Sequence, residues 1–405
     1  MIGIKSVSIP VRMPILLPMQ VLIKVFVKIR YVIMSIVMIL SVSTYADTAK
    51  IDEKNTNGLI KVEGKELLQP NGDVFSIQGI SFGNRVWTND RLPYKHHDKD
   101  DYARVKALGM NTVRFYINYQ TLEHDDKPYS YLDDGWQWLD KNIEWAKENN
   151  VYLILNIHVP QGGFQSNGDG WGLWTDHELQ NRLVAMWKAI AQRYKNETTV
   201  LAYDLLNEPG VPKNKEQWQV LAQRLVNEVR KIDADHPLVI ARVNNIAKRW
   251  DEDKDLNFIR VVGDNLIYTF HTYEPFFYTH QYIHWDKRMV NRDGGTWPDE
   301  KRGHNRARLD RTIKRFVDWG NRNSVPLYLG EWGLYKATFQ NNHGGENYLI
   351  DMLAVIKKYK LHQTYHVYHE EAFGLYWGDD EIDPENKNRA LEGILKKHLK
   401  THNQD

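Results

Sequence analysis

The 405-residue chain contains no cysteine, which excludes disulfide bonds, thiolate metal sites and a cysteine nucleophile. It carries almost no net charge, because 53 Lys and Arg nearly balance 52 Asp and Glu, so the charge gives no reason to expect a nucleic-acid partner. A glycine-rich phosphate loop after the first predicted strand, which marks a dinucleotide-binding fold, is also missing. What remains has an average globular composition, 42% hydrophobic, and is long enough to bury a large core.

The N-terminal part of the chain differs in composition from the rest. It contains a basic stretch followed by 12 uncharged, mostly apolar residues at 31–42 and then by small residues. This apolar run is shorter than the ~20 residues that span a bilayer. We therefore expect residues 1–46 to be a signal peptide with an over-long start, in which Met13 or Met19 is the initiator. Residues 47–405 are then a secreted or periplasmic protein with no stable membrane span; an uncleaved anchor is the alternative.

The rest of the chain alternates short apolar runs with helical patterns. The eight runs that we interpret as strands cover residues 76–82, 111–118, 151–159, 200–207, 238–244, 266–273, 326–332 and 363–369. Near-continuous apolar runs are typical of parallel strands covered by helices. Seven of the eight precede a helix-like pattern, and the segment after the fifth, at 246–262, is irregular.

Eight such units predict a single-domain α/β protein over 47–405, a (β/α)8 TIM barrel. A small N-terminal β-hairpin is expected at 59–75, where two apolar runs are separated by turn residues. A doubly wound open sheet is the competing fold.

Two glutamates stand out among the residues at the strand ends. In a barrel of this kind the catalytic residues lie at the carboxyl ends of the strands. Glu208 and Glu331 each follow a buried run directly, on the fourth and seventh strands. A lone glutamate there is more readily explained as an ion-pair partner for Arg114 or as a rim residue. Two of them, with His, Asn and Tyr around, favour the paired carboxyls of glycoside hydrolysis.

Aromatic residues in the loops provide a second indication of a sugar substrate. Flat aromatic faces beside polar groups suit pyranose rings. We expect a groove lined by tryptophans that lie outside the predicted strands and helices, namely Trp171, Trp174, Trp285, Trp297 and Trp377.

Five segments resemble glycoside hydrolase family 5, the cellulase family of clan A. They are LAYDLLNEP at 201–209, LYLGEWG at 327–333, TFHTYEPFFYTHQ at 269–281, NTVRFYIN at 111–118 and NIHVPQGG at 156–163. Together they place the resemblance over about residues 75–378.

The resemblance implies a role for each matching residue. Glu208 would be the general acid/base and Glu331 the nucleophile. The substrate-binding and positioning residues would be Arg114, His158, Asn207, His271 and Tyr273. The family usually has a tryptophan at the end of the eighth strand, which is absent here, and Trp377 is the candidate for that role.

The activity expected from these features is that of a retaining, endo-acting β-1,4-glucanase on a polysaccharide or oligosaccharide, as a monomer and without cofactor or metal. β-Mannanase, exo-β-1,3-glucanase and glycosylceramidase share the motifs and remain alternatives, as does a barrel that binds polysaccharide without cleaving it. His96–His97 and His280…His284 offer a metal-site interpretation. Solvated or sugar-contacting histidines are the preferred interpretation, because a metal site needs three or four converging ligands.

Overall fold

The computed structural model describes residues 58–88, 90–378 and 380–402. The expected signal peptide at 1–46 lies outside these residues. Eight parallel strands form a closed barrel: β4 (Gln78–Phe82), β5 (Thr112–Asn118), β6 (Tyr152–Val159), β7 (Val200–Asp204), β9 (Leu238–Ala241), β11 (Leu266–His271), β12 (Leu327–Glu331) and β13 (His362–Tyr365). Each strand falls within or beside its predicted run, so the predicted (β/α)8 TIM barrel is confirmed.

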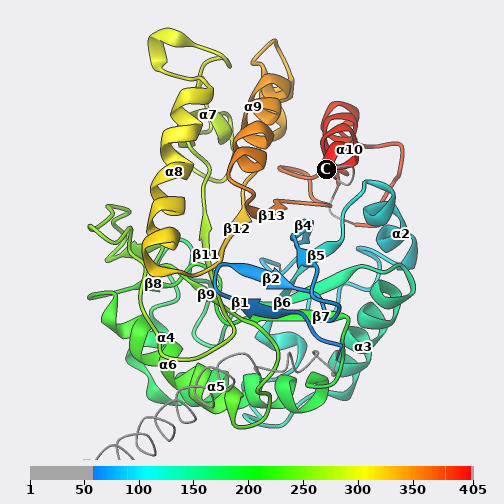
Figure 1. Cartoon of the computed structure of the whole chain (residues 1–405), viewed down its shortest axis with the longest axis vertical. Helices are drawn as coiled ribbons and strands as arrows, with labels where there is room; N and C mark the ends of the chain where they lie inside the picture. Colours follow the sequence, from blue (N-terminus) through cyan, green and yellow to red (C-terminus); the bar gives the residue numbers. More distant parts are fainter. Residues whose placement is uncertain (1–57, 89, 379, 403–405) are drawn as a thin grey trace, which may run out of the picture. The chain divides into compact units, whose positions relative to one another are not determined.

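Helices surround the strands in Figure 1. The main helices are α2 (Lys99–Ala107), α3 (Asp133–Glu148), α5 (His177–Tyr194), α6 (Glu216–Arg230), α8 (Arg306–Asn323), α9 (Gly345–Lys358) and α10 (Arg389–His402). The described residues 242–265, between β9 and β11, contain no helix, in agreement with the irregular pattern there. None of the described helices combines the length and apolarity needed to cross a membrane.

The loops contain several short helices, turns and strands. They are the helices α4 (Gly172–Thr175) and α7 (Phe276–Thr279), the 3-10 turns η1 (Tyr119–Thr121), η2 (Glu300–Arg302) and η3 (Lys336–Phe339), and the paired strands β8 (Gly210–Val211) and β10 (Asn245–Ile246). Those after β6, β7, β9, β11 and β12 belong to the loops that follow the carboxyl ends of the barrel strands.

The predicted hairpin is a three-stranded antiparallel sheet of β1 (Lys61–Glu63), β2 (Glu66–Leu68) and β3 (Val74–Phe75). Its buried Leu67 and Phe75 join a hydrophobic cluster with Val239, Ile267 and Tyr328, each the second residue of a barrel strand. The sheet therefore packs at the amino ends of the strands, and the carboxyl ends are left for the site.

Candidate active site

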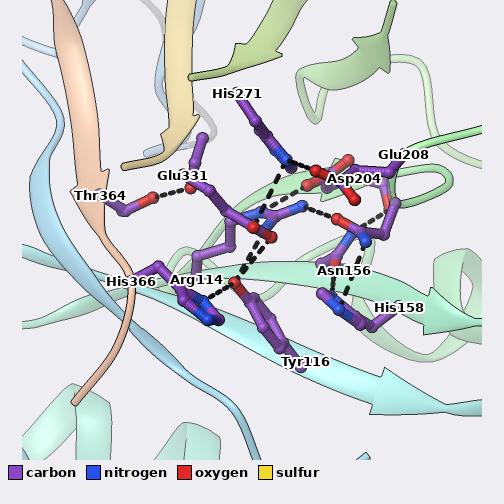
Figure 2. A network of polar contacts seen from close by, with 12 residues as sticks. Arg114, Tyr116, Asn156, His158, Asp204, Glu208, His271, Glu331, Thr364 and His366 are labelled. Atoms are coloured by element: carbon purple, nitrogen blue, oxygen red, sulfur yellow. Dashed lines mark hydrogen bonds and ion pairs between the residues drawn. The ribbon is translucent and has the colours of Figure 1, made fainter. Parts of the chain in front are cut away.

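Glu208 and Glu331 come together at the carboxyl ends of β7 and β12 (Figure 2). An oxygen of Glu208, an oxygen of Glu331 and a ring nitrogen of His271 all lie within 4.8 Å of one another. The Glu331 side chain is 6% exposed and that of Glu208 is 16% exposed. The two acids therefore share one site but differ in their environments.

Glu331 is the more tightly held of the two acids. Its Oε1 accepts hydrogen bonds from Arg114 Nη1 at 2.6 Å and from Tyr116 Oη at 2.9 Å. Its Oε2 accepts one from Tyr273 Oη at 2.9 Å. Arg114 also donates from Nε to Asp204 Oδ2 at 2.8 Å. The buried guanidinium of β5 is therefore bonded to side chains of both β7 and β12. Three donors thus fix the orientation of the Glu331 carboxylate.

The surroundings of Glu331 favour its ionised form. Burial alone would raise the pKa of this carboxyl, but His271, His366 and Arg114 outweigh burial and hold the pKa well below 4.5. Burial and the Glu331 charge raise the pKa of Tyr273 well above 10, so this phenol keeps its proton and donates it. This is the electrostatic state that a carboxylate nucleophile requires.

Glu208 is held in a different way. Its backbone φ of +42° lies in the left-handed region, which side-chain-bearing residues rarely adopt. Its Oε1 lies 2.8 Å from His271 Nδ1, and its Oε2 lies 3.5 Å from Asn244 Nδ2. The local backbone turns out of β7 at this point and directs the carboxyl toward β11 and Glu331.

Asn207 and His158 form a pair whose protons can be assigned. Asn207 Oδ1 accepts from Arg114 Nη2 at 2.9 Å, which leaves the Asn207 amide nitrogen facing His158 Nε2 at 3.3 Å. An amide nitrogen only donates, so His158 Nε2 accepts and the His158 proton sits on Nδ1, 3.0 Å from Asn156 Oδ1. Burial lowers the pKa of His158 well below 6.5, which agrees with a neutral ring.

His366 and Tyr116 complete the network beside Glu331. Burial raises the pKa of Tyr116 well above 10, so the phenol keeps its one proton. An ionised carboxylate can only accept, so Tyr116 donates this proton to Glu331. His366 Nδ1 lies 3.1 Å from Tyr116 Oη and must therefore be the donor to that oxygen. Burial lowers the pKa of His366, although the nearby Glu331 charge acts in the opposite direction, and the Nδ1 proton faces Tyr116.

A cleft of about 1260 Å³ opens beside Glu208. Two exposed tryptophans line it: Trp285, which is 56% exposed, and Trp250, which the sequence analysis did not name. Trp174 and Trp297 are 7% and 2% exposed, and their indole nitrogens donate to Gln165 and Asp351. The prediction that these two form sugar platforms is wrong, because both are packed into the protein.

Of the other predicted tryptophans, neither Trp171 nor Trp377 lines this cleft. Trp171 is half-buried, with Lys248 Nζ 5.7 Å from its ring centroid. Trp377 is half-buried beside Asn386, to which its backbone is hydrogen-bonded, outside the network of Figure 2. The structure thus brings together seven of the eight predicted site residues and leaves Trp377 apart.

The histidine pairs considered as metal ligands do not gather with other ligands. His96 and His97 are buried, not solvated, and His97 Nε2 donates to Asn142 Oδ1 at 2.8 Å. His280 lines the cleft and stacks on Phe276. Within the described ranges, the one group of three with suitable ligand atoms is Glu208, His271 and Glu331. These three residues lie close together because the two acids are paired at the site. Both carboxylates already have hydrogen-bonding partners within the protein.

Three site residues were not predicted from the sequence: Tyr116, Asp204 and Asn156. A usable signal exists for two of them. Side chains alternate between the two faces of a strand, so Tyr116 faces the same way as Arg114, and Asn156 the same way as His158. His366, which lies in the predicted eighth strand at 363–369, was likewise not assigned to the site.

The known proteins that this chain resembles include endoglucanases and a cellodextrinase. Endoglucanase C of Acetivibrio thermocellus is 28% identical over 282 residues, covering 63% of this chain and 81% of that protein. Cellodextrinase A of Ruminococcus flavefaciens is 24% identical over 263 residues, covering 64% and 76%. The structure of endoglucanase Cel5A of Thermotoga maritima matches with a TM-score of 0.65 at 24% identity, covering 79% of this chain and 96% of that one.

The model of the cellulase family, glycosyl hydrolase family 5, matches residues 68–371, and this span includes every barrel strand and both glutamates. The chain is therefore a glycoside hydrolase that belongs to glycosyl hydrolase family 5.

Proposed function

We propose that the protein is a retaining, endo-acting β-1,4-glucanase in which Glu331 is the nucleophile and Glu208 the general acid/base. The observation that carries this proposal is the short separation of the two acids, with an oxygen of each within 4.8 Å. Retaining glycosidases place their carboxyls about 5–5.5 Å apart, whereas inverting enzymes need ~6.5–9.5 Å to admit a water molecule.

The proposed reaction has two steps. Glu331 attacks the anomeric carbon while Glu208 gives its proton to the departing glycosidic oxygen, and a covalent glycosyl ester forms on Glu331. Glu208 then takes a proton from water, which displaces Glu331 from the anomeric carbon and restores both acids. The sugar keeps its anomeric configuration because the carbon is inverted twice.

The residues around the acids have distinct proposed roles. Arg114 and Tyr273 hold Glu331 ionised and oriented, consistent with their 2.6 and 2.9 Å hydrogen bonds. Asn207 would bind the sugar 2-hydroxyl, and His158 and His271 would line the subsite of the ring to be cleaved. We add Tyr116 to the positioning residues, since its hydroxyl donates to Glu331.

The substrate is proposed from the relatives and from the cleft. Proteins named endoglucanase and cellodextrinase match 63–64% of the chain. A cleft of about 1260 Å³ with exposed Trp250 and Trp285 suits several sugar units of a glucan. We propose a β-1,4-linked glucan as substrate, with contact from Trp377 still a prediction. A secreted or periplasmic monomer, released by cleavage after residue 46 and acting without cofactor, completes the proposal.

A panel of barley β-glucan, carboxymethyl cellulose, mannan and laminarin tests the proposal, with reducing ends and viscosity measured together. We expect a rapid fall in viscosity on the first two. Strong hydrolysis of mannan with no hydrolysis of glucan would show that the substrate is a mannan. Hydrolysis of laminarin would indicate a β-1,3-glucanase. Binding without turnover of any glycan would support the non-catalytic alternative.

A further inference from the structure

The cleft beside Glu208 has a basic wall formed by α8 and the loop after β9. Arg308, Thr312, Arg315 and Phe316 occupy one face of α8 at helical spacing, and all four line the cleft. Arg242, just after β9, lies with its guanidinium 5.3 Å from the Phe316 ring centroid, and the Arg315 guanidinium lies 6.0 Å from it. Two arginines from separate elements therefore meet over one aromatic ring.

These two arginines share a single carboxylate. Arg242 Nη1 donates to Glu252 Oε1 at 2.5 Å, and Arg315 Nη2 donates to Glu252 Oε2. Each guanidinium has five N–H donors, and Glu252 engages one nitrogen of each. One negative charge thus faces two permanent positive charges, and N–H donors remain on both arginines.

The local excess of positive charge is confined to the two arginines that share Glu252. The cleft lining includes five bases (Arg242, Lys287, Arg288, Arg308 and Arg315) and four acids (Glu208, Glu252, Glu274 and Asp286), and Arg288 and Arg308 are ion-paired with Asp286 and Glu274. Residues 47–405 as a whole have 48 bases and 52 acids, so this doubly basic spot lies in a mildly acidic protein. A neutral glucan gains only hydrogen bonds from these arginines, whereas a carboxylate also gains the attraction of their charge.

The position of the wall relative to the scissile bond follows from Glu208. Of the two acids, Glu208 lines the cleft, together with His271 and Tyr273. In the proposed reaction Glu208 protonates the departing oxygen, so it stands where the ring to be cleaved meets the leaving group. On this ground we place the leaving-group sugars against the basic wall.

We infer that this wall binds carboxylate groups on the leaving-group sugars, so that the preferred substrate is an acidic glycan, with uronic acids or carboxyl-bearing substituents on its backbone. The inference rests on the proposed function. Arg242 and Arg315 would bind the carboxylate with planar, paired N–H donors, the geometry that distinguishes guanidinium from ammonium.

Two soluble cellulose ethers separate charge from backbone. Carboxymethyl cellulose and hydroxyethyl cellulose share the β-1,4-glucan chain, and only the first is anionic. The quantity to measure is the ratio of kcat/KM on the two. We expect Arg242→Gln/Arg315→Gln to lower this ratio at least fivefold, and 0.5 M NaCl to lower it severalfold in the wild-type enzyme because salt screens exposed charges.

Arg311→Gln is the matched control. Arg311 lies on α8, is exposed and does not line the cleft, so its loss changes the net charge by the same one unit as Arg315→Gln and should leave the ratio unchanged. Arg315→Gln alone, at a side chain that is 52% exposed, replaces the double variant if that one fails to fold. A ratio that is the same in the wild type and the arginine variants overturns the inference, while hydrolysis of hydroxyethyl cellulose leaves the proposed function standing.

Affinity electrophoresis measures the same preference without turnover. With Glu331→Gln as background, carboxymethyl cellulose in the gel should retard the protein more than hydroxyethyl cellulose does, and the arginine changes should abolish the difference. Equal retardation by the two polymers contradicts the inference. Failure of the wild-type enzyme to hydrolyse either polymer counts against the proposed β-1,4-glucanase activity and not against the basic wall.

Discussion

Arg114 Nη1 lies 2.6 Å from Glu331 Oε1, and both side chains are buried. The same guanidinium donates to Asp204 and Asn207, which lie in and after β7. One arginine on β5 therefore sets the positions of groups from the fourth and seventh barrel strands. This side chain therefore joins Glu331 and Asn207, the residue that precedes Glu208, in one hydrogen-bond network.

Replacing Arg114 should affect both stability and the pH profile. Arg114→Met leaves Glu331 and Asp204 as buried carboxylates without their cation, and we expect the free energy of unfolding to fall by about 3–5 kcal/mol. The pKa of Glu331 should rise toward and above 4.5, since Arg114 contributes to lowering it. The acid limb of kcat/KM, which lies below pH 4.5 in the wild type, should move to higher pH.

Arg182→Met provides the comparison for that prediction. Arg182 Nη2 donates to the buried Glu123 at 3.0 Å, so its loss should also destabilise the protein, but Arg182 is remote from the two acids. An acid limb that stays in place in both variants would show that Arg114 does not control the ionisation of Glu331.

Buried histidines should make the fold sensitive to mild acid. Burial lowers the pKa of His97 and of His362 from 6.5 to about 4. The unfolded chain therefore takes up protons below pH 6.5 before the folded chain does, and stability present above that pH is lost as the pH falls to 4. The loss amounts to about 3 kcal/mol for each histidine. Urea denaturation at pH 7, 5.5 and 4.5 measures this decline.

His97→Gln keeps a donor for Asn142 but cannot titrate, so the decline in stability should be smaller than in the wild type. The exposed His124→Gln serves as its control and should leave the decline unchanged. Equal pH dependence in the wild type and His97→Gln would contradict the assignment of His97 as a buried neutral ring.

Tyr116 should matter for turnover and little for binding. Tyr116→Phe removes one donor from the Glu331 carboxylate, and a hydrogen bond to a charged group contributes about 1.5–3 kcal/mol. We expect kcat to fall roughly 10–150-fold, which is the same free energy expressed as a rate. Tyr203→Phe, which removes an equally buried hydroxyl bonded to Asp233 at 2.8 Å, should lower stability but leave kcat unchanged. A similar fall in kcat in both variants would reduce the role of Tyr116 to packing.

The tryptophans should divide into two groups. Trp285→Ala should weaken binding of a soluble glucan by about 1–3 kcal/mol, because Trp285 exposes its face in the cleft. Trp297→Ala should instead cost about 3–5 kcal/mol of stability, as a fully packed aromatic does, with glucan affinity retained. Isothermal titration and thermal unfolding of both variants distinguish the two effects. An unchanged affinity in Trp285→Ala would mean that the glucan does not follow this cleft.

The barrel could be predicted from the sequence because its strands are buried on both faces. For example, the segment at 151–159, VYLILNIHV, is almost entirely apolar, which predicts a buried strand, and β6 occupies 152–159 within it. The site could be located because strand ends converge in this fold. Asp204 escaped notice because a buried acid in the middle of an apolar run gives no sign of its partner, which lies 90 residues away in the sequence.

The tryptophans show what local pattern could not supply. Trp174 and Trp297 lie in loop segments rich in polar residues, which is why they were expected to be accessible. Their burial depends on partners distant in the chain, Trp218 for Trp174 and Asp351 for Trp297. Exposure of a loop aromatic is a property of tertiary packing, and periodicity does not report it.

In the proposed reaction Glu331 attacks the sugar, and Glu208 serves as acid and then base. The most direct test is proton NMR of the anomeric signals during the first minutes of hydrolysis of a soluble β-1,4-glucan oligosaccharide. We expect the β-anomer to appear first and the α-anomer to grow in only as mutarotation proceeds. An α-anomer as the first product would mean inversion, and would contradict the role of Glu331 as nucleophile.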